Sequence, residues 1–261
     1  MNSLNKRESA PIENSTIEAQ MGHRTIRAFT DEPLTEDELT TLYEVARHTA
    51  SSSFLQQTTI IRVTDPVVRE RLHAASGQPY VGGTHGELLV FVADQYRNSR
   101  IREEGGVDNA SLHRTNLLLT ALHDALLAAQ NVVVAAESMG LGTCYLGSIH
   151  ADPRAVIEAL GLPELTFPVL GLLVGHPDQE PQFKPRLPLS VIVAENSYPK
   201  VDSYSELIAD YDEIITDYYD MRDTSKRTES FSTLVRTTIG VAGAHVSPIL
   251  EVLNEQGFAL E

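Results

Sequence analysis

A long apolar segment at residues 111–139 constrains the fold of this chain more than any other feature. Read as a helix, it is apolar on most sides, and a helix of this kind is normally buried. Its most apolar part, residues 117–136, is interrupted by His123, Asp124, Gln130 and Asn131. These interruptions indicate a buried helix and not a membrane span. We therefore expect this helix at the centre of a domain or in a dimer interface.

Around this segment, helices and strands alternate only loosely, and the expected helices outnumber the strands. A capping box of Thr35 and Glu38 begins one helix, and Asp-Pro pairs begin helices at residues 66 and 153. β-Branched and apolar runs predict strands at residues 58–64, 87–93, 143–147 and 167–174. The polar stretch 95–110 is expected to be a surface loop. This order favours an α+β fold over a doubly wound sheet.

The two ends of the chain differ in composition and patterning from its centre. Residues 1–20 are polar without a sustained period and predict a flexible N-terminal arm. Four prolines between residues 176 and 189 predict a rigid, extended connection. An amphipathic helix then follows the capping box of Ser203 and Glu206, and this segment must dock on another surface. We expect a single domain over residues 21–261.

The charge and composition of the chain argue against nucleic-acid, metal and membrane partners. There are 20 Lys and Arg against 36 Asp and Glu, a formal net charge of −16. Duplex nucleic-acid binders are normally basic, so no nucleic-acid partner is expected. One cysteine, Cys144, excludes a disulfide framework and a cysteine-rich metal site, and no metal ligand is predicted. Without an apolar signal segment near the N-terminus, we expect a cytoplasmic protein with no membrane partner.

Basic residues gather in three places in this acidic chain. The clusters are His23, Arg24 and Arg27; Lys184 and Arg186; and Arg222, Lys226 and Arg227. Charge-assisted hydrogen bonds from such residues suit a phosphate or an anionic ring, although each cluster alone is more often solvated surface charge. Pro185 sets an extended backbone within the second cluster, which lowers the entropic cost of holding an anion.

Two uncharged features could also face a ligand. Ser51, Ser52 and Ser53 form either a nest of hydroxyl and amide groups or simply a turn after a helix. Gly147, just after a strand, would let a backbone N–H approach a planar ligand closely. Other chemistry has less support, because no G-x-S-x-G elbow is present and Cys144 is more typical of a packed thiol.

These features occur in an order that resembles the FMN-dependent nitroreductase family, in its NADPH-linked oxygen-insensitive nitroreductase and flavin reductase branch. The resemblance covers roughly residues 21–261. It rests on the blocks GHRTIRAFT from residue 22, SSSFLQ from 51, GQPYV from 77, AAESMGLG from 135, CYLG from 144, LGL from 170, KPRLP from 184, ENSY from 195 and YY from 218, with Arg222 following. The family implies a homodimer with a mixed central sheet flanked by helices, FMN sites at the interface, and C-terminal segments that wrap the partner subunit.

The resemblance also implies a role for each matched residue. FMN would be bound by His23, Arg24, Thr25, Arg27, Ser51, Ser52, Ser53, Gln78, Pro79, Tyr80, Tyr145, Leu146, Gly147, Ser148, Lys184 and Arg186. Of these, the serines at 51–53 would come from the other subunit. The NADPH 2′-phosphate would be held by Arg222 and Arg227. Leu146 and Ser148 depart from the family pattern, where Ile and Gly are common, and Ser148 narrows the space beside the flavin.

The function implied by the resemblance is that of an oxidoreductase. It would take hydride from NADPH and pass two electrons to a nitroaromatic, quinone, flavin or similar acceptor by a ping-pong mechanism. No side chain need act as acid or base, because the flavin performs the chemistry while Arg27 and Gly147 tune it. The alternatives are a non-catalytic FMN-binding protein, a dehalogenase or flavin-breakdown enzyme on the same scaffold, and a serine hydrolase.

Overall fold

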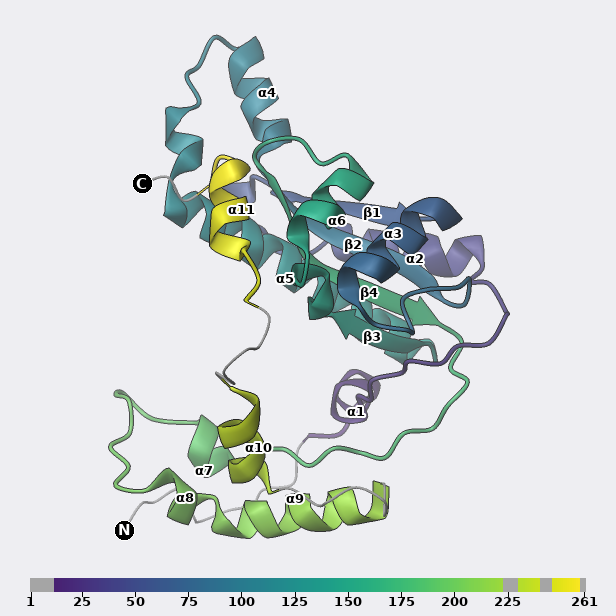
Figure 1. Cartoon of the computed structure of the whole chain (residues 1–261), viewed down its shortest axis with the longest axis vertical. Helices are drawn as coiled ribbons and strands as arrows, with labels where there is room; N and C mark the ends of the chain where they lie inside the picture. The colour runs from purple at the N-terminus through teal and green to yellow at the C-terminus, as the bar shows by residue number, and fades with distance from the viewer. Residues whose placement is uncertain (1–11, 223–229, 240–245, 259–261) are drawn as a thin grey trace. The chain divides into compact units, whose positions relative to one another are not determined.

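The computed structural model describes residues 12–222, 230–239 and 246–258, with side chains left undescribed at 219–222 (Figure 1). The chain divides into two compact units. The larger comprises residues 14–181 and 245–261, and the smaller comprises residues 1–13 and 182–244. The boundary falls among the prolines that predicted an extended connection. A single FMN-binding domain over 21–261 stays a prediction.

The larger unit contains a four-stranded sheet and most of the helices. Its elements are α1 (Ser15–Met21), α2 (Glu36–Arg47), β1 (Thr58–Val63), α3 (Pro66–Ser76), β2 (Glu87–Asp94), α4 (Tyr96–Glu104), α5 (Thr115–Ser138), β3 (Gly142–Leu146), α6 (Pro153–Leu160), β4 (Thr166–Gly175) and α11 (Ile249–Glu255). Short 3-10 turns lie at η2 (Ser52–Phe54), η3 (Ala110–His113) and η4 (Gly147–His150). The α+β class, the four strands and the capping box of α2 are confirmed.

Two segments that we expected to be irregular contain helices. Helix α1 overlaps the end of the expected N-terminal arm, where the Asn14 side chain accepts hydrogen bonds from the amides of Thr16 and Ile17 at 3.1 and 3.0 Å. Helix α4 lies inside the expected loop 95–110. It is polar on nearly every side, so no apolar period reveals it, and the ion pair of Arg100 with Glu103 stabilises it instead.

The sheet has the strand order β1-β2-β4-β3, and every neighbouring pair is antiparallel. Parallel pairing in the described residues is limited to an isolated bridge between Thr25 and Thr143, so the expected mixed sheet is mixed only through this bridge. Pro168 lies in the inner strand β4, opposite Val92 of β2. The pairing register of β2 with β4 shifts there, between Phe91 and Val92. At such a bulge the strand needs no backbone N–H from proline for its ladder of hydrogen bonds.

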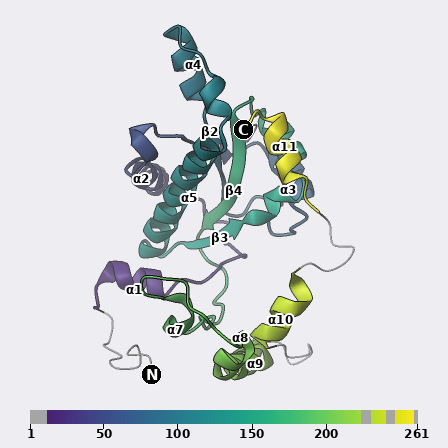
Figure 2. The same ribbon diagram turned by 90° about the vertical axis from the view of Figure 1, so that its left-hand side faces the viewer.

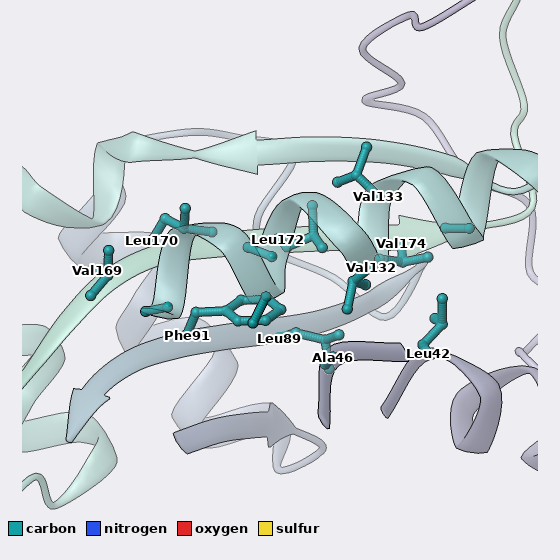
Figure 3. Packing of buried hydrophobic residues seen from close by; sticks show 14 of the residues in the cluster. Leu42, Ala46, Leu89, Phe91, Val132, Val133, Val169, Leu170, Leu172 and Val174 are labelled. Carbon is teal, nitrogen blue, oxygen red and sulfur yellow. The ribbon is translucent and has the colours of Figure 1, made fainter. Parts of the chain in front are cut away.

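Helices cover both faces of this sheet. On one face, Leu89 and Phe91 of β2 pack with α2 and α5 (Figure 3). On the other face, Leu88 and Val90 pack with α3 and α6, as the alternation of side chains along a strand requires. Figure 2 shows α5 lying against the strands, beside α2. By length and composition α5 could cross a membrane, but Ala121, Ala125, Ala129 and Ala136 on it are fully buried in the core against this sheet.

The smaller unit is helical in its described part. It contains α7 (Leu189–Ile192), α8 (Tyr204–Leu207), α9 (Ala209–Arg222) and α10 (Phe231–Thr238). Ile208, Tyr211 and Ile215 are buried at helical spacing, and the Tyr211 ring meets the Phe231 ring edge-on at 5.5 Å. The segment predicted as one amphipathic helix forms two helices, α8 and α9, which are divided at Ile208. The Ser203 hydroxyl caps α8 by accepting from the Glu206 amide at 3.3 Å, and the buried residues form a core of their own.

Candidate functional site

The first basic cluster enters the larger unit beside β3. The Ile26 amide donates a hydrogen bond to the Thr143 carbonyl at 2.8 Å, next to the bridge between Thr25 and Thr143. Ile26 is buried, Thr25 is half-buried and Arg27 is exposed. The buried isoleucine thus anchors a short extended segment whose polar side chains remain accessible.

A carboxylate from the C-terminal end of α5 holds His23. Glu137 Oε1 lies 2.7 Å from His23 Nδ1 and accepts a hydrogen bond from the Thr143 hydroxyl at 2.8 Å. The Glu137 side chain is only 12% exposed. Burial, and then the charge of Glu137, raises the pKa of Tyr145 to about 12. The sequence block from residue 135 contains Glu137, but only the fold shows that it contacts the basic cluster.

Arg24 lies at a small cavity next to this contact. The cavity has a volume of about 330 Å³, and Gly22, Arg24 and Glu137 are among its lining residues. The Arg24 guanidinium donates to the Gly22 carbonyl at 2.8 Å, which curls the side chain over its own segment. A cation and a carboxylate therefore share the cavity wall.

Gly147, directly after β3, has open space in front of its backbone. A side chain on Gly147 would meet nothing within 4 Å, so the space in front of it is open. The Ser148 hydroxyl is buried without a hydrogen-bond partner in the described part of the chain. Leu146 is 1% exposed and packs in the core, and its contact with FMN stays a prediction. Tyr145 is 37% exposed and donates to Gln130 at 3.0 Å.

The turn that carries Gln78, Pro79 and Tyr80 meets the first cluster through a ring. The Arg27 guanidinium lies 5.5 Å from the centroid of the Tyr80 ring, a cation–π arrangement between segments distant in sequence. The Val81 amide donates to the Gln78 carbonyl at 3.0 Å and closes the turn. The structure thus brings together two of the predicted groups, at residues 23–27 and 78–80.

Of the three serines at 51–53, Ser51 faces a different hollow. Ser51 lines a cavity of about 630 Å³ together with residues of α2, β1, α4 and α5, and neither Arg24 nor Arg27 is part of its wall. Within one chain, the serines are therefore not grouped with the basic cluster.

The remaining predicted residues belong to the smaller unit. The Arg186 guanidinium donates to the Lys184 carbonyl at 2.7 Å and lies 5.8 Å from the centroid of the Phe183 ring. The approach of Lys184 and Arg186 to the first cluster stays a prediction. Arg222 ends α9, but its side chain is not described, and Lys226 and Arg227 lie outside the described residues.

A buried arginine that the sequence did not single out holds the turn at 78–80. Arg69 on α3 is 7% exposed and donates to the carbonyls of Val81 at 2.9 Å, His85 at 2.9 Å and Gly86 at 2.7 Å. Burial lowers its pKa. The available signal was its spacing from Leu72, which places a charge on the buried face of a predicted helix.

Comparison with known proteins places this geometry in a family. The profile of the nitroreductase family matches residues 21–176, and that of the nitroreductase family C-terminal domain matches residues 184–261. The chain is 42% identical over 222 residues to the FMN reductase (NADPH) of Bacillus subtilis, covering 84% of this chain and 89% of that protein. It is 39% identical over 244 residues to the oxygen-insensitive NADPH nitroreductase of Salmonella typhimurium, covering 94% and 98%.

Solved structures agree with these matches. A nitroreductase from Bacillus subtilis superposes with a TM-score of 0.88 at 38% identity, covering 94% of this chain and all (100%) of that one. The NADPH:FMN oxidoreductase of Vibrio harveyi, complexed with NAD+, superposes with a TM-score of 0.84 at 37% identity, covering 95% and 100%. The chain therefore belongs to the nitroreductase family.

Proposed function

We propose that this chain is an FMN-dependent oxidoreductase that takes hydride from NADPH and passes two electrons to nitroaromatic, quinone, flavin or similar acceptors. The observation that carries the proposal is the match, over 84% and 94% of the chain, to relatives named for NADPH-linked flavin and nitro reduction. The NADPH specificity is assigned to Arg222 and Arg227, because an arginine fork suits the 2′-phosphate.

The described residues fit FMN chemically. His23, Arg24 and the Thr25 hydroxyl offer donors for a phosphate, and open space before Gly147 lets a planar ring approach the backbone. The unpartnered, buried Ser148 hydroxyl has hydrogen-bonding capacity left for a polar edge of the ring. When bound, FMN supplies hydride acceptance and two-electron donation, which no side chain can provide.

The protein's own groups then act by position and charge. Glu137 holds Nδ1 of His23 and fixes the ring, and Nε2 would donate to an anion in the protonated imidazolium form. The Arg27 guanidinium, which lies over the Tyr80 ring, would supply positive charge beside a bound FMN. Gln78 and Pro79 would line the same side, Tyr145 would run along the ring, and Lys184 and Arg186 would complete the phosphate site.

We further propose a homodimer in which the smaller unit wraps the partner subunit. Leu119, Leu126 and Leu127 on α5 are 47%, 46% and 51% exposed, although α5 is apolar on most sides. Together with the 630 Å³ hollow beside Ser51, this surface supports a permanent interface, which we expect to bury more than about 2,000 Å². Dimerisation would bring Ser51, Ser52 and Ser53 to the partner's FMN. A cytoplasmic location fits the function and stays a proposal.

Anaerobic stopped-flow mixing of the purified, FMN-loaded protein with NADPH tests the function. We expect the visible flavin absorbance to bleach and to return when a quinone or nitroaromatic is added, with parallel double-reciprocal plots at steady state. A protein that binds FMN but bleaches with neither nicotinamide cofactor is the non-catalytic alternative. A protein without flavin absorbance would exclude the proposal.

A further inference from the structure

Loop 51–57, which carries the three serines, has a left-handed backbone at residues that are not glycine. Ser53, Phe54 and Gln56 have φ angles of 53°, 61° and 50°. Side chains disfavour this region, and such residues persist only where surrounding contacts hold the backbone in place. The conformation of the loop therefore depends on groups outside it.

A buried carboxylate holds the amide side of the loop. Asp124 on α5 is 3% exposed; its Oδ1 accepts from the Ser52 amide at 2.8 Å, and its Oδ2 from the Gln57 amide at 3.2 Å. The Gln57 side-chain amide adds a third hydrogen bond at 3.3 Å. No ion pair to Asp124 occurs among the described residues. A buried charge needs such partners, and here all three belong to the loop.

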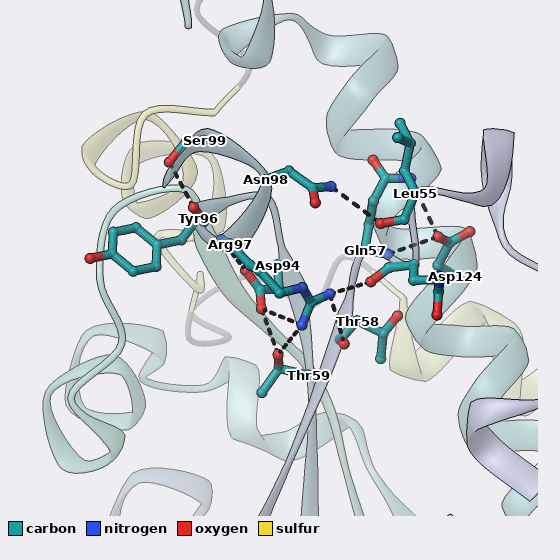
Figure 4. Close-up of polar contacts among 11 residues, drawn as sticks. Leu55, Gln57, Thr58, Thr59, Asp94, Tyr96, Arg97, Asn98, Ser99 and Asp124 are labelled. Carbon is teal, nitrogen blue, oxygen red and sulfur yellow. Dashed lines mark hydrogen bonds and ion pairs between the residues drawn. The ribbon is translucent and has the colours of Figure 1, made fainter. Parts of the chain in front are cut away.

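Helix α4 holds the carbonyl side of the same loop (Figure 4). The Arg97 guanidinium donates to the Gln56 carbonyl and, at 3.5 Å, to the Thr58 carbonyl, while Asn98 Nδ2 donates to the Leu55 carbonyl at 3.3 Å. Asp94 lies 3.4 Å from Arg97 and orients it. The loop is thus fixed through its amides by one helix and through its carbonyls by another.

We infer that Asp124, assisted by Arg97 and Asn98, is a positioning residue for FMN binding by loop 51–57. The inference rests on the proposed function, in which the serines contact FMN. The contacts above fix the backbone and leave the hydroxyls of Ser52 and Ser53 without a hydrogen bond in the described part of the chain. Pre-organising the loop lowers the entropic cost that binding would otherwise carry.

The test is a fluorescence titration of FMN into the FMN-stripped, full-length Asp124→Asn variant. Asparagine replaces one accepting oxygen by a donor, so a loop amide loses its partner. We expect the FMN Kd to rise by roughly tenfold to a hundredfold, the range for a lost hydrogen bond to a charged group. Hydrogen exchange at residues 51–57 should also accelerate. A matched control is Val252→Ala, which weakens a separate core cluster and should leave the FMN Kd unchanged within about twofold.

A second variant covers the case in which Asp124→Asn does not fold. Arg97→Met changes a side chain that is 44% exposed and should raise the FMN Kd by about threefold to tenfold. Wild-type affinity in the folded variants, or an equal loss in Val252→Ala, would overturn the inference. A Ser52→Ala, Ser53→Ala double variant separates the positioning role of Asp124 from the proposed function. Unchanged FMN affinity in this variant would mean that the serines do not contact FMN, and would overturn the positioning role. A wild-type protein that binds no FMN would overturn the proposed function.

Discussion

Two loops of the larger unit reach similar backbone conformations by opposite means. Loop 77–86 places its left-handed residues at Gly77, Gly83 and Gly86, with φ angles of 63°, 76° and 68°. Loop 51–57 places them at residues that carry side chains. Each loop is held by a buried charge: the guanidinium of Arg69 binds carbonyls of the first, and the carboxylate of Asp124 binds amides of the second.

The two loops therefore differ in which residues determine their conformation. Glycine makes the left-handed conformation inexpensive, so loop 77–86 is encoded mainly by its own sequence and by a nearby helix. Loop 51–57 depends on Asp124, which lies 72 residues beyond Ser52 in the chain. Its shape is consequently a tertiary property, and it should respond most to changes made far away in sequence.

The largest expected effect comes from removing the charge at the first loop. Arg69→Met leaves three backbone carbonyls without their donor, and we expect the free energy of unfolding to fall by about 3 kcal/mol or more. Urea denaturation measures the loss. The control is Arg71→Met on the same helix, whose ion pair with Glu158 is exposed and should contribute less than about 1 kcal/mol. Equal losses in the two variants would contradict the role of Arg69.

Adding a side chain within the glycine loop should have the next largest effect. An alanine Cβ at Gly86 would lie 3.0 Å from Phe29 Cδ2 and 3.1 Å from Cγ, in addition to the left-handed strain. We expect Gly86→Ala to destabilise by about 2–4 kcal/mol, and Gly77→Ala, where nothing lies within 4 Å, by about 1–2 kcal/mol. Thermal unfolding of both variants checks the order, and a larger loss at Gly77 would refute it.

Replacing a left-handed residue of loop 51–57 by glycine should have the opposite effect on stability. Gln56→Gly relieves a left-handed residue while adding backbone freedom to the unfolded chain, so stability should stay unchanged or rise by up to about 1 kcal/mol. Gly77→Ala, measured under the same denaturation conditions, is its mirror control. A loss above about 1 kcal/mol in Gln56→Gly would mean that the side chain, and not the backbone, matters at this position.

The smallest expected effect is on the pH dependence of stability, through Tyr145, which lies in neither loop. Burial and the charge of Glu137 raise the pKa of Tyr145 from 10.0 to about 12. Because the pKa is raised in the folded state, the contribution of Tyr145 to the free energy of unfolding is complete below pH 10 and is lost as pH rises toward 12. Tyr145→Phe should therefore flatten the fall in stability over this window, modestly because the residue is 37% exposed. Identical pH profiles for the two proteins would count against the shift.

Local signals in the sequence were sufficient for much of the fold. The capping box at Thr35 and the apolar strands appear as predicted, because each is determined by neighbouring residues. Helix α4 was missed, since a helix that is polar all round has no apolar period. The unit boundary was visible only as a run of prolines.

The candidate site divides in the same way. Residues 23–27 and Gly147 were proposed because short motifs carry them, and the structure brings Arg27 to Tyr80. Asp124 was visible only as an interruption of an apolar helix, and Glu137 only as part of a block. Their roles depend on partners far away in sequence, at Ser52 and His23, which no local pattern specifies.

A crystal structure of the FMN-loaded protein would show where the flavin binds. We expect a homodimer with the FMN phosphate within hydrogen-bond distance of His23 and Arg24. The ring should lie against Gly147 and Arg27, with the loop 51–57 of the partner subunit closing the site. FMN bound instead in the 630 Å³ hollow beside Ser51 of its own chain, away from Arg24 and Arg27, would refute the proposed FMN site.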